Sequence, residues 1–335
     1  EALLEATPAV MQPGDLLAGI SLVVPAEGSS IDLGEYDGHY TPGHANILRL
    51  GLTGIRDRAR EKLADQTDPA KRDFLEAAAI AYEAARRFAE KHAVHAGQLA
   101  AETADLERQQ ELVRAAAACG ELATGAPTSF QAGLQALWFT FLFGGRGSIG
   151  RFDQWMYPLY RADIDGGRLT HEQAQELLEN FFVKLNYFAG NNDSLRNIVV
   201  GGQTPAGADA CNELSYMCLL AGGRLMLPEP KLNVRFHVGS PRALLELSCR
   251  LTCKGLSNPA YFNDEVAIPG LLALGIPLED ARDYCNDGCS ELSMGDRSTS
   301  RFRNFDALPM LNETVQRGEE AAFDSFADVM ADFQQ

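Results

Sequence analysis

Apolar residues recur at steps of three and four through most of the first 140 residues, which is the spacing of amphipathic helices. The stretch 69–103 keeps this spacing with charged residues between the apolar ones, and residues 104–119 continue it. The segment 129–143 is nearly all apolar, which predicts a buried helix with Trp138 in the core. Residues 1–140 are therefore predicted to form a mostly helical part.

The pattern changes in residues 141–335. The segments NIVVGG (197–202) and KLNVRFHV (231–238) are short runs that are each followed by Gly, Pro or Ser and then by a helical stretch. Such runs favour buried parallel strands with return helices, and this alternation is typical of a parallel sheet or barrel in an α/β protein. No repeat, low-complexity tract or linker divides the chain, so residues 1–335 are interpreted as one domain.

Composition narrows the possible partners. A net charge of −17 argues against nucleic acid, because affinity for nucleic acid depends on Lys and Arg contacts to phosphate. No run reaches the ~18 apolar residues that a membrane span needs, and no basic segment followed by an apolar one opens the chain. These features argue against a nucleic-acid partner and against a membrane partner. They predict a cytoplasmic location.

The seven cysteines are odd in number and lie in mostly helical contexts, which indicates reduced thiols rather than a disulfide scaffold. Cys249 and Cys253 are four residues apart, so we expect them on one helix face. A metal site would need further ligands at suitable spacing, and none stands nearby. Two small buried side chains are therefore favoured there, and no metal is expected in this chain.

The segment NDGCSELS, residues 286–293, places a thiol two positions from a carboxylate. In an extended or looped backbone, residues two apart point to the same side, so the side chains of Cys289 and Glu291 could face one small cavity. Gly288 allows a tight turn just before them. These residues alone fit equally well a buried structural cysteine beside a surface glutamate.

Five segments, read together, resemble one enzyme family. They are GHYTPGHANILRLGLTGI (38–55), GRFDQWMYPLYRADIDGGRLTHEQAQELLENFFVKLN (150–186), NIVVGGQTPAGADACNELSYMCLLA (197–221), LPEPKLNVRFHVGSP (227–241) and YFNDEVAIPGLLALGIPLEDARDYCNDGCSEL (261–292). In this order the chain resembles the glycyl radical enzymes, the pyruvate formate-lyase-like family. The resemblance implies a thiyl radical on Cys289 and a general acid/base role for Glu291. It also implies a barrel of two half-barrels surrounded by helices, with the cysteine loop as a finger in the lumen, of which this chain carries a half-barrel and the loop.

The resemblance also implies a radical that this chain does not carry by itself. Family members store it on a glycine in a C-terminal loop of the form Arg-Val-x-Gly-Tyr, and no such segment occurs before Gln335. We therefore expect a fragment of a longer protein or one chain of a split enzyme, inactive alone. The implied partners are a radical-SAM activating enzyme with a [4Fe-4S] cluster, a second copy in a homodimer, and a small-molecule substrate in anaerobic metabolism.

The chemistry of the pair favours elimination. In an enclosed lumen Glu291 would be desolvated, so it could accept and return a proton near neutrality. Removal of a hydrogen atom beside a hydroxyl makes that hydroxyl more acidic, and a base then drives loss of a neighbouring substituent such as water, an amine or sulfite. The expected reaction is thiyl-radical elimination or bond cleavage, at a C–O, C–N, C–S or C–C bond. The adjacent Cys-Cys pair used for acyl transfer to coenzyme A is absent. The alternatives are acyl transfer of the formate C-acetyltransferase type and a non-catalytic subunit that binds small metabolites.

Candidate substrate contacts surround this pair. His39 lies in the region where the family places a polar contact, although a structural histidine that caps a turn fits this position equally well. His44 is a weaker candidate because Pro42 and Gly43 direct it elsewhere. Ser148 occupies the stretch before the Gly-Arg-Phe-Asp-Gln run, where diol-dehydrating relatives carry a His-Ser pair, which speaks against a glycerol-type dehydratase.

Charged residues flank the same motifs. Arg297, Arg301 and Arg303 follow the loop and form either a solvated face or a clamp in which Arg303 binds an anionic substrate group. Asp306 is a further polar candidate. Arg151 and Asp153 are interpreted as an ion pair that holds the fold.

Overall fold

The computed structural model describes residues 8–19, 38–144, 147–186, 196–255, 258–295, 297–301, 307–320 and 323–333. The chain divides into two compact units, residues 1–300 and residues 301–335. Each unit is described by itself.

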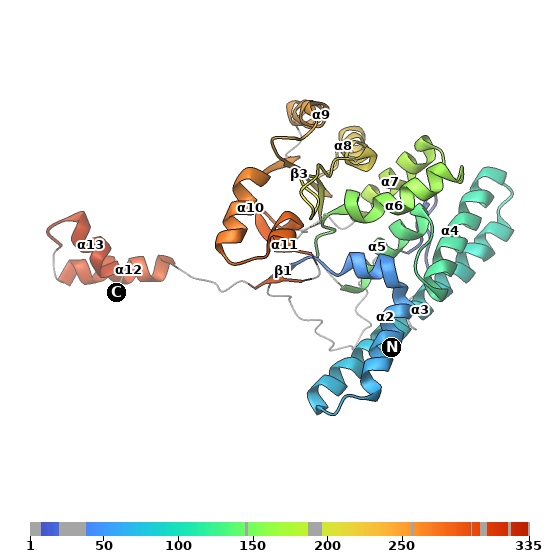
Figure 1. Ribbon diagram of the computed structural model, residues 1–335, viewed down its shortest axis with the longest axis horizontal. Helices are drawn as coiled ribbons and strands as arrows, with labels where there is room; N and C mark the ends of the chain where they lie inside the picture. The colour runs from blue at the N-terminus through green and yellow to red at the C-terminus, as the bar shows by residue number, and fades with distance from the viewer. Residues whose placement is uncertain are drawn as a thin grey trace. The chain divides into compact units, whose positions relative to one another are not determined.

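Long helices form the first part of the larger unit, and their bounds are α2 His44–Ala64, α3 Pro69–Glu102, α4 Leu106–Thr124 and α5 Phe130–Gly144. Asp68 caps α3 by accepting a 3.0 Å hydrogen bond from the backbone N–H of Ala70, and Asp105 caps α4 in the same way. The chain kinks at Gly51, where φ is +68° and a Cβ atom would lie 2.2 Å from the carbonyl oxygen of Gly125. Figure 1 shows α3 beside α2 and α4. The predicted helices at 69–103 and 104–119 are confirmed.

Helix α5 lies in the centre of the core. Trp138 is fully buried, and its indole N–H donates a 3.0 Å hydrogen bond to the carbonyl oxygen of Gly19. The Gln135 side chain bonds both backbone groups of Ala18, at 2.7 and 2.9 Å. Helix α5 therefore binds the irregular segment around Ala18 and Gly19. The prediction of a buried helix is confirmed.

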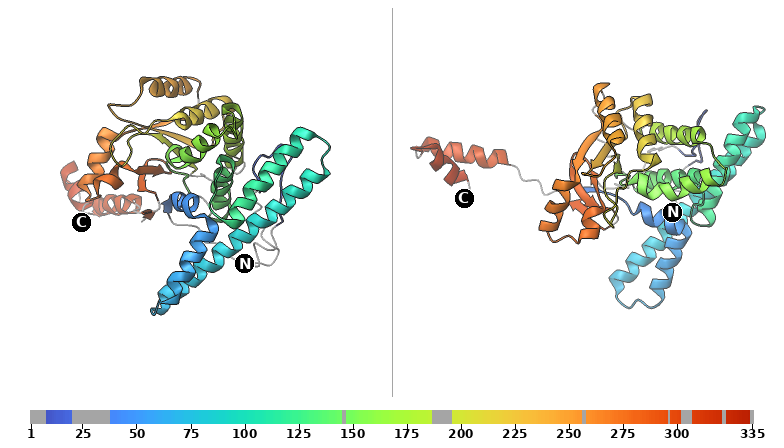
Figure 2. Two further views of the ribbon diagram at one scale, coloured as in Figure 1. Left: turned by 45° about the vertical axis from the view of Figure 1, so that its right-hand side comes forward. Right: turned by 45° about the horizontal axis from the view of Figure 1, so that its top comes forward.

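The second part of the larger unit alternates strands and helices. Its elements are α6 Phe152–Asp165, α7 His171–Asn186, β2 Asn197–Gly201, α8 Glu213–Leu225, β3 Lys231–Phe236, α9 Arg242–Cys253, β4 Ala260–Asn263, α10 Asp264–Ala273, α11 Leu278–Arg282, β5 Tyr284–Asp287, β6 Glu291–Met294 and β7 Thr299–Arg301. Strand β1 Gly38–Tyr40 comes earlier in the chain, before α2. Strands β2, β3 and β4 form a parallel sheet in that order, β5 and β6 form an antiparallel hairpin, and β1 pairs with β7. The predicted parallel strands and α/β class are confirmed. Figure 2 shows α8 beside this sheet, and α9 packs against α8.

The two faces of the parallel sheet differ in polarity. Alternate side chains point to opposite faces, so Leu232 and Val234 share the face covered by α8, where Leu232 meets Gly222. The other face carries Asn197, Asn233 and Arg235, which are all at most 1% exposed. Buried polar side chains need hydrogen-bond partners, and the hairpin supplies two of them, the carbonyl oxygens of Gly288 and Tyr284.

The smaller unit consists of α12 Ala307–Glu320 and α13 Phe326–Phe333. The guanidinium of Arg317 joins them through an ion pair of 2.7 Å to Asp332. Leu308 and Phe326 are exposed, so this pair of helices buries little apolar surface within itself.

The structure also tests the expectations for the cysteines and for membrane helices. Cys249 and Cys253 lie in α9 as expected, but both are exposed, so the prediction that they are buried is wrong. All seven cysteines are free thiols. None of the helices in the described ranges is both long and apolar enough to cross a membrane.

Candidate active site

The thiol and carboxylate of the NDGCSELS segment lie at the tip of the β5–β6 hairpin. Asp287 pairs with Glu291 across the hairpin, so Gly288, Cys289 and Ser290 form the turn. Gly288 has φ +65°, a backbone conformation that favours glycine, and Cys289 is exposed. The sequence expectation of a tight non-helical loop is confirmed, and the thiol is accessible at its end.

The Glu291 side chain folds back onto this turn. Its Oε2 atom accepts hydrogen bonds from the backbone N–H groups of Cys289, at 2.8 Å, and Ser290, at 3.0 Å. Hydrogen bonds to a carboxylate are stronger than those between neutral groups. The carboxylate is therefore fixed against the backbone of the residue that carries the thiol.

Arg235 holds the base of the hairpin. Its guanidinium forms a bidentate ion pair with Asp264, with both N–O distances at 2.9 Å, and neither side chain is exposed. It also donates to the carbonyl oxygens of Tyr284, at 2.7 Å, and Arg282, at 2.8 Å. The Tyr284 hydroxyl donates to Asp264 at 2.8 Å, and burial raises the pKa of that tyrosine. The side chains of Arg235, Asp264 and Tyr284 thus hold the start of β5 against β3.

A second buried arginine supports the same end. Arg151 forms a 2.9 Å ion pair with Asp283 and donates to the carbonyl oxygen of Gly201 at 3.1 Å. Asp153 instead accepts from the N–H of Gly201, at 2.7 Å, and from the hydroxyl of Ser215, at 2.6 Å. Arg151 and Asp153 therefore do not form an ion pair with each other, and that prediction is wrong. Burial lowers the pKa of Arg151 and raises that of Asp153.

Ser148 and Asn197 connect the hairpin to the first strand of the sheet. The Ser148 hydroxyl lies 3.1 Å from the carbonyl oxygen of Asn197 and 3.0 Å from that of Asn286, and it accepts from the N–H of Gly150 at 3.1 Å. The Asn197 side-chain amide donates to the carbonyl oxygen of Gly288 at 2.9 Å. All these contacts of Ser148 hold backbone, and its predicted role in substrate binding stays a prediction.

The other face of the hairpin carries a buried thiol. Cys285 Sγ lies 3.2 Å from the hydroxyl of Thr41 and 3.3 Å from that of Ser293. Burial raises the pKa of Cys285, which the two hydroxyl contacts partly oppose. The two cysteines of this segment therefore differ: Cys285 is packed inside, whereas Cys289 is exposed at the tip.

His44 begins α2 and is buried against the same region. Its ring centroid lies 5.9 Å from that of Trp155, and neither ring nitrogen has a hydrogen bond of normal geometry within the described ranges. Burial lowers the pKa of His44 to about 4, although the backbone of Ser148 opposes this. The imidazole is therefore neutral at pH 7.

The remaining predicted contacts are less completely described. His39 lies in β1, and its side chain is outside the description. Arg303 and Asp306 lie outside the described residues, as does the side chain of Arg301. Arg297 is exposed and forms an ion pair with Asp280.

Sequence reasoning missed the residues that hold the hairpin. Asn197 begins an otherwise apolar strand, and Asn233 and Arg235 alternate with apolar residues in the next strand, so this signal could have identified a polar sheet face. Their partners could not be read from spacing, since Asn197 and Gly288 are 91 residues apart.

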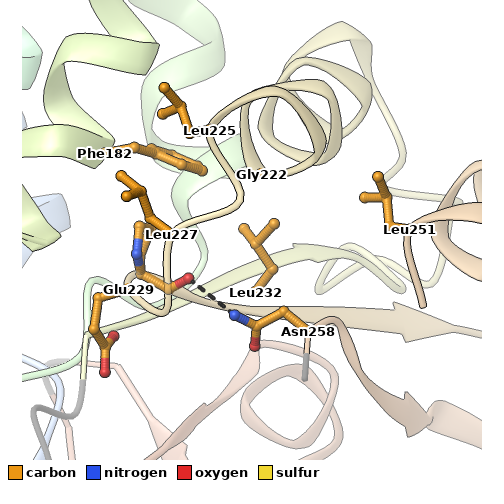
Figure 3. A pocket seen from close by; sticks show the side chains of 9 residues that line it. Phe182, Gly222, Leu225, Leu227, Glu229, Leu232, Leu251 and Asn258 are labelled. Atoms are coloured by element: carbon orange, nitrogen blue, oxygen red, sulfur yellow. Dashed lines mark hydrogen bonds between the residues drawn. The ribbon is translucent and has the colours of Figure 1, made fainter. Parts of the chain in front are cut away.

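The described residues contain no group of three or more His, Cys, Asp or Glu side chains that could hold a metal ion. A small gap lies on the opposite, helix-covered face of the sheet, between α7, α8 and α9 (Figure 3). Phe182, Leu225, Leu232 and Leu251 line it, together with polar residues such as Asn258, whose side-chain amide lies 3.5 Å from the carbonyl oxygen of Pro230. Since Leu232 faces α8, this gap is separate from the hairpin.

The fold and site define a class: an α/β protein in which a cysteine hairpin packs on the polar face of a parallel sheet. The chain belongs to the pyruvate formate lyase-like family, whose family model matches residues 33–333. It is 34% identical to isethionate sulfite-lyase from Oleidesulfovibrio alaskensis over 281 residues, which cover 76% of this chain and 34% of that protein. The chain thus spans about a third of the length of the curated relatives it matches.

Two solved structures extend the comparison. The glycerol-bound B12-independent glycerol dehydratase from Clostridium butyricum has a TM-score of 0.80 at 32% identity, over 89% of this chain and 42% of that one. A glycyl radical enzyme from Archaeoglobus fulgidus has a TM-score of 0.71 at 27% identity, over 77% of this chain and 36% of that one. The resemblance to glycyl radical lyases and dehydratases is confirmed, and so is the barrel fold class, of which the described strands form a partial, unclosed sheet.

Proposed function

We propose that Cys289 and Glu291 carry out radical elimination on a small polar substrate, which makes the full-length protein a glycyl radical lyase or dehydratase. One observation carries the proposal: the Glu291 carboxylate binds the backbone N–H of Cys289 at the tip of a hairpin whose base and turn are both anchored. A base and a hydrogen acceptor must share one site for this reaction. The relatives support the reaction class through the lyase and dehydratase activities that their names give.

Cys289 and Glu291 together could make every hydrogen-atom and proton transfer that the reaction needs. A glycyl radical would supply the one-electron oxidation of the thiol. Cys289 would then take a hydrogen atom from a substrate C–H bond, which leaves a carbon radical beside a hydroxyl. Glu291 would take the hydroxyl proton while the neighbouring substituent departs with its bonding electron pair, and it would return the proton to the leaving group. The product radical would recover a hydrogen atom from the Cys289 thiol.

The radical and its source are part of the proposal. The glycine would lie in a segment C-terminal to these residues, and a radical-SAM activating enzyme with a [4Fe-4S] cluster would install the radical. Exposure of Cys289 at the hairpin tip suits a thiol that must meet another segment. We further propose an anaerobic, cytoplasmic homodimer. The seven free thiols support the reducing compartment.

The substrate is proposed to be small, polar and anionic. His39, Ser148, Arg303 and Asp306 would contact it, with Arg303 on the anionic group. The similarity to an isethionate sulfite-lyase supports a negatively charged substrate group.

The test compares two exposed cysteines in the full-length protein, activated anaerobically. Cys289→Ala should keep the glycyl radical doublet in electron paramagnetic resonance but lose turnover, because the glycine stores the radical and the thiol uses it. Cys249→Ala, which also removes an exposed thiol, should keep both. Residual turnover in Cys289→Ala would remove the thiyl mechanism.

A further inference from the structure

One side chain of the sheet reaches the turn that carries the proposed catalytic thiol. The Asn197 amide donates a 2.9 Å hydrogen bond to the carbonyl oxygen of Gly288, the residue before Cys289. Asn197 is 1% exposed, and Gly288 is buried with φ +65°. The direction of the Gly288 peptide sets the direction of the turn, so this contact acts directly on the backbone that places the thiol.

Asn197 is itself firmly fixed. It is the first residue of β2 and pairs with Lys231 of β3. Its carbonyl oxygen accepts hydrogen bonds from the N–H groups of Ile149, at 2.9 Å, and Gly150, at 3.1 Å, and lies 3.1 Å from the Ser148 hydroxyl. The turn is therefore tied to a backbone position that is held from both neighbouring segments.

The chemistry of position 197 indicates a role beyond packing. The Oδ1 atom of Asn197 is buried and has no hydrogen-bond partner among the described residues. Leaving a buried polar atom unpaired is unfavourable, and an apolar side chain of the same shape would avoid that cost. The bond from the amide nitrogen to Gly288 is what an apolar residue could not make.

We propose that Asn197 is a positioning residue for Cys289: it holds the Gly288 peptide and so fixes where the thiol meets the substrate. The proposal rests on the proposed function of Cys289. Hydrogen transfer requires the reacting atoms at near-contact geometry, and a displacement of about 1 Å can cost on the order of 10²-fold in rate. Asn197 affects this geometry without touching the substrate.

Asn233 provides a matched control. It lies on the same sheet face in the adjacent strand and is likewise 1% exposed. Its side-chain amide donates to the carbonyl oxygen of Lys231 in its own strand, at 3.2 Å. No hydrogen bond from Asn233 to the hairpin occurs within the described ranges. Asn197→Leu and Asn233→Leu thus make the same chemical change at equal burial, and only the first removes a contact to the turn.

The experiment uses the full-length protein and follows amide hydrogen exchange in the peptide that contains Cys289 and Ser290. Asn197→Leu should speed this exchange roughly five- to tenfold, the effect of losing one hydrogen bond. It should also lower kcat by about tenfold or more with KM and the glycyl radical signal unchanged. Asn233→Leu should alter neither the exchange at the turn nor kcat.

Equal behaviour of the two Leu variants in exchange and in kcat would overturn the positioning role. If Asn197→Leu does not melt cooperatively, Asn197→Ala replaces it; failure of both, with Asn233→Leu folded, would show that Asn197 maintains the fold and would also overturn the proposal. Comparison of the parent with Cys289→Ala distinguishes failure of the proposed function from failure of the positioning role. Turnover without Cys289 contradicts the proposed function, whereas normal turnover in Asn197→Leu contradicts only the role of Asn197.

Discussion

The guanidinium of Arg235 lies 3.7 Å from the ring centroid of Tyr284 and donates a 2.7 Å hydrogen bond to the carbonyl oxygen of the same residue. One side chain of β3 thereby holds both the ring and the backbone of the first residue of β5. Asp264 balances the buried charge of the arginine and also accepts from the Tyr284 hydroxyl. The base of the cysteine hairpin is thus built on a desolvated ion pair, whose disruption is costly.

Replacing Arg235 should therefore destabilise the protein strongly. Arg235→Met removes one partner and leaves the Asp264 carboxylate buried without its counter-charge, so we expect a loss of about 3–5 kcal/mol in the free energy of unfolding. Urea denaturation measures this. The double variant Arg235→Met, Asp264→Asn should recover part of the loss because it removes the stranded charge. A double variant less stable than Arg235→Met would contradict this explanation.

The sequence predicted elements better than contacts. The helices at 69–103 and 104–119 and the strand at 231–238 follow from local periodicity, which needs no knowledge of partners. The partner of Arg151 does not: Asp283 is 132 residues away, whereas Asp153 is merely close in sequence. Long-range polar pairing depends on how the elements pack, which local spacing does not specify.

The same limit applied to burial. The spacing of Cys249 and Cys253 correctly placed both in one helix, but periodicity cannot say which side chains another element covers. At the hairpin, sequence reasoning placed Cys289 and Glu291 in one non-helical loop from their two-residue spacing, whereas their catalytic roles came from the family resemblance and stay predictions. It did not find Asn197, which reaches the turn from a distant strand.

Glu291→Gln should separate elimination from other radical chemistry. Glutamine keeps an oxygen that can accept from the N–H groups of Cys289 and Ser290, but it cannot serve as the base. Product formation should fall by roughly 10² or more. Hydrogen exchange between substrate and thiol should continue, which incorporation of deuterium into substrate in D₂O would detect. Unchanged product formation would indicate a carbon–carbon cleavage that needs no base here.

Stability should decrease in mild acid because of His44. Burial lowers its pKa from 6.5 to about 4, so the unfolded chain binds a proton before the folded protein does. The stabilising effect of the neutral imidazole is complete above pH 6.5 and is lost as the pH falls towards 4. A shift of this size corresponds to ~3 kcal/mol. His92, whose pKa burial also lowers to about 4, should contribute similarly.

His44→Phe tests this assignment. Phenylalanine can still pack beside Trp155 but does not titrate, so it should remove the part of the pH dependence between 6.5 and 4 that His44 contributes. The free energy of unfolding of the full-length protein, measured across this range, gives the comparison. Parallel curves for the variant and the parent would show that His44 does not titrate as described.

Among the arginines that follow the hairpin, Arg297 provides an internal control for Arg303. Arg297 is 64% exposed and pairs with Asp280 on the surface, so Arg297→Lys should leave substrate binding unchanged. Arg303→Lys keeps the charge but loses the planar fork, so a bidentate clamp on an anionic substrate should weaken by ~1–3 kcal/mol, measured as substrate affinity. Arg301→Lys completes the set. If all three variants bind and convert the substrate like the parent, the arginines form a solvated face, and the proposal of an anionic substrate held by Arg303 is wrong.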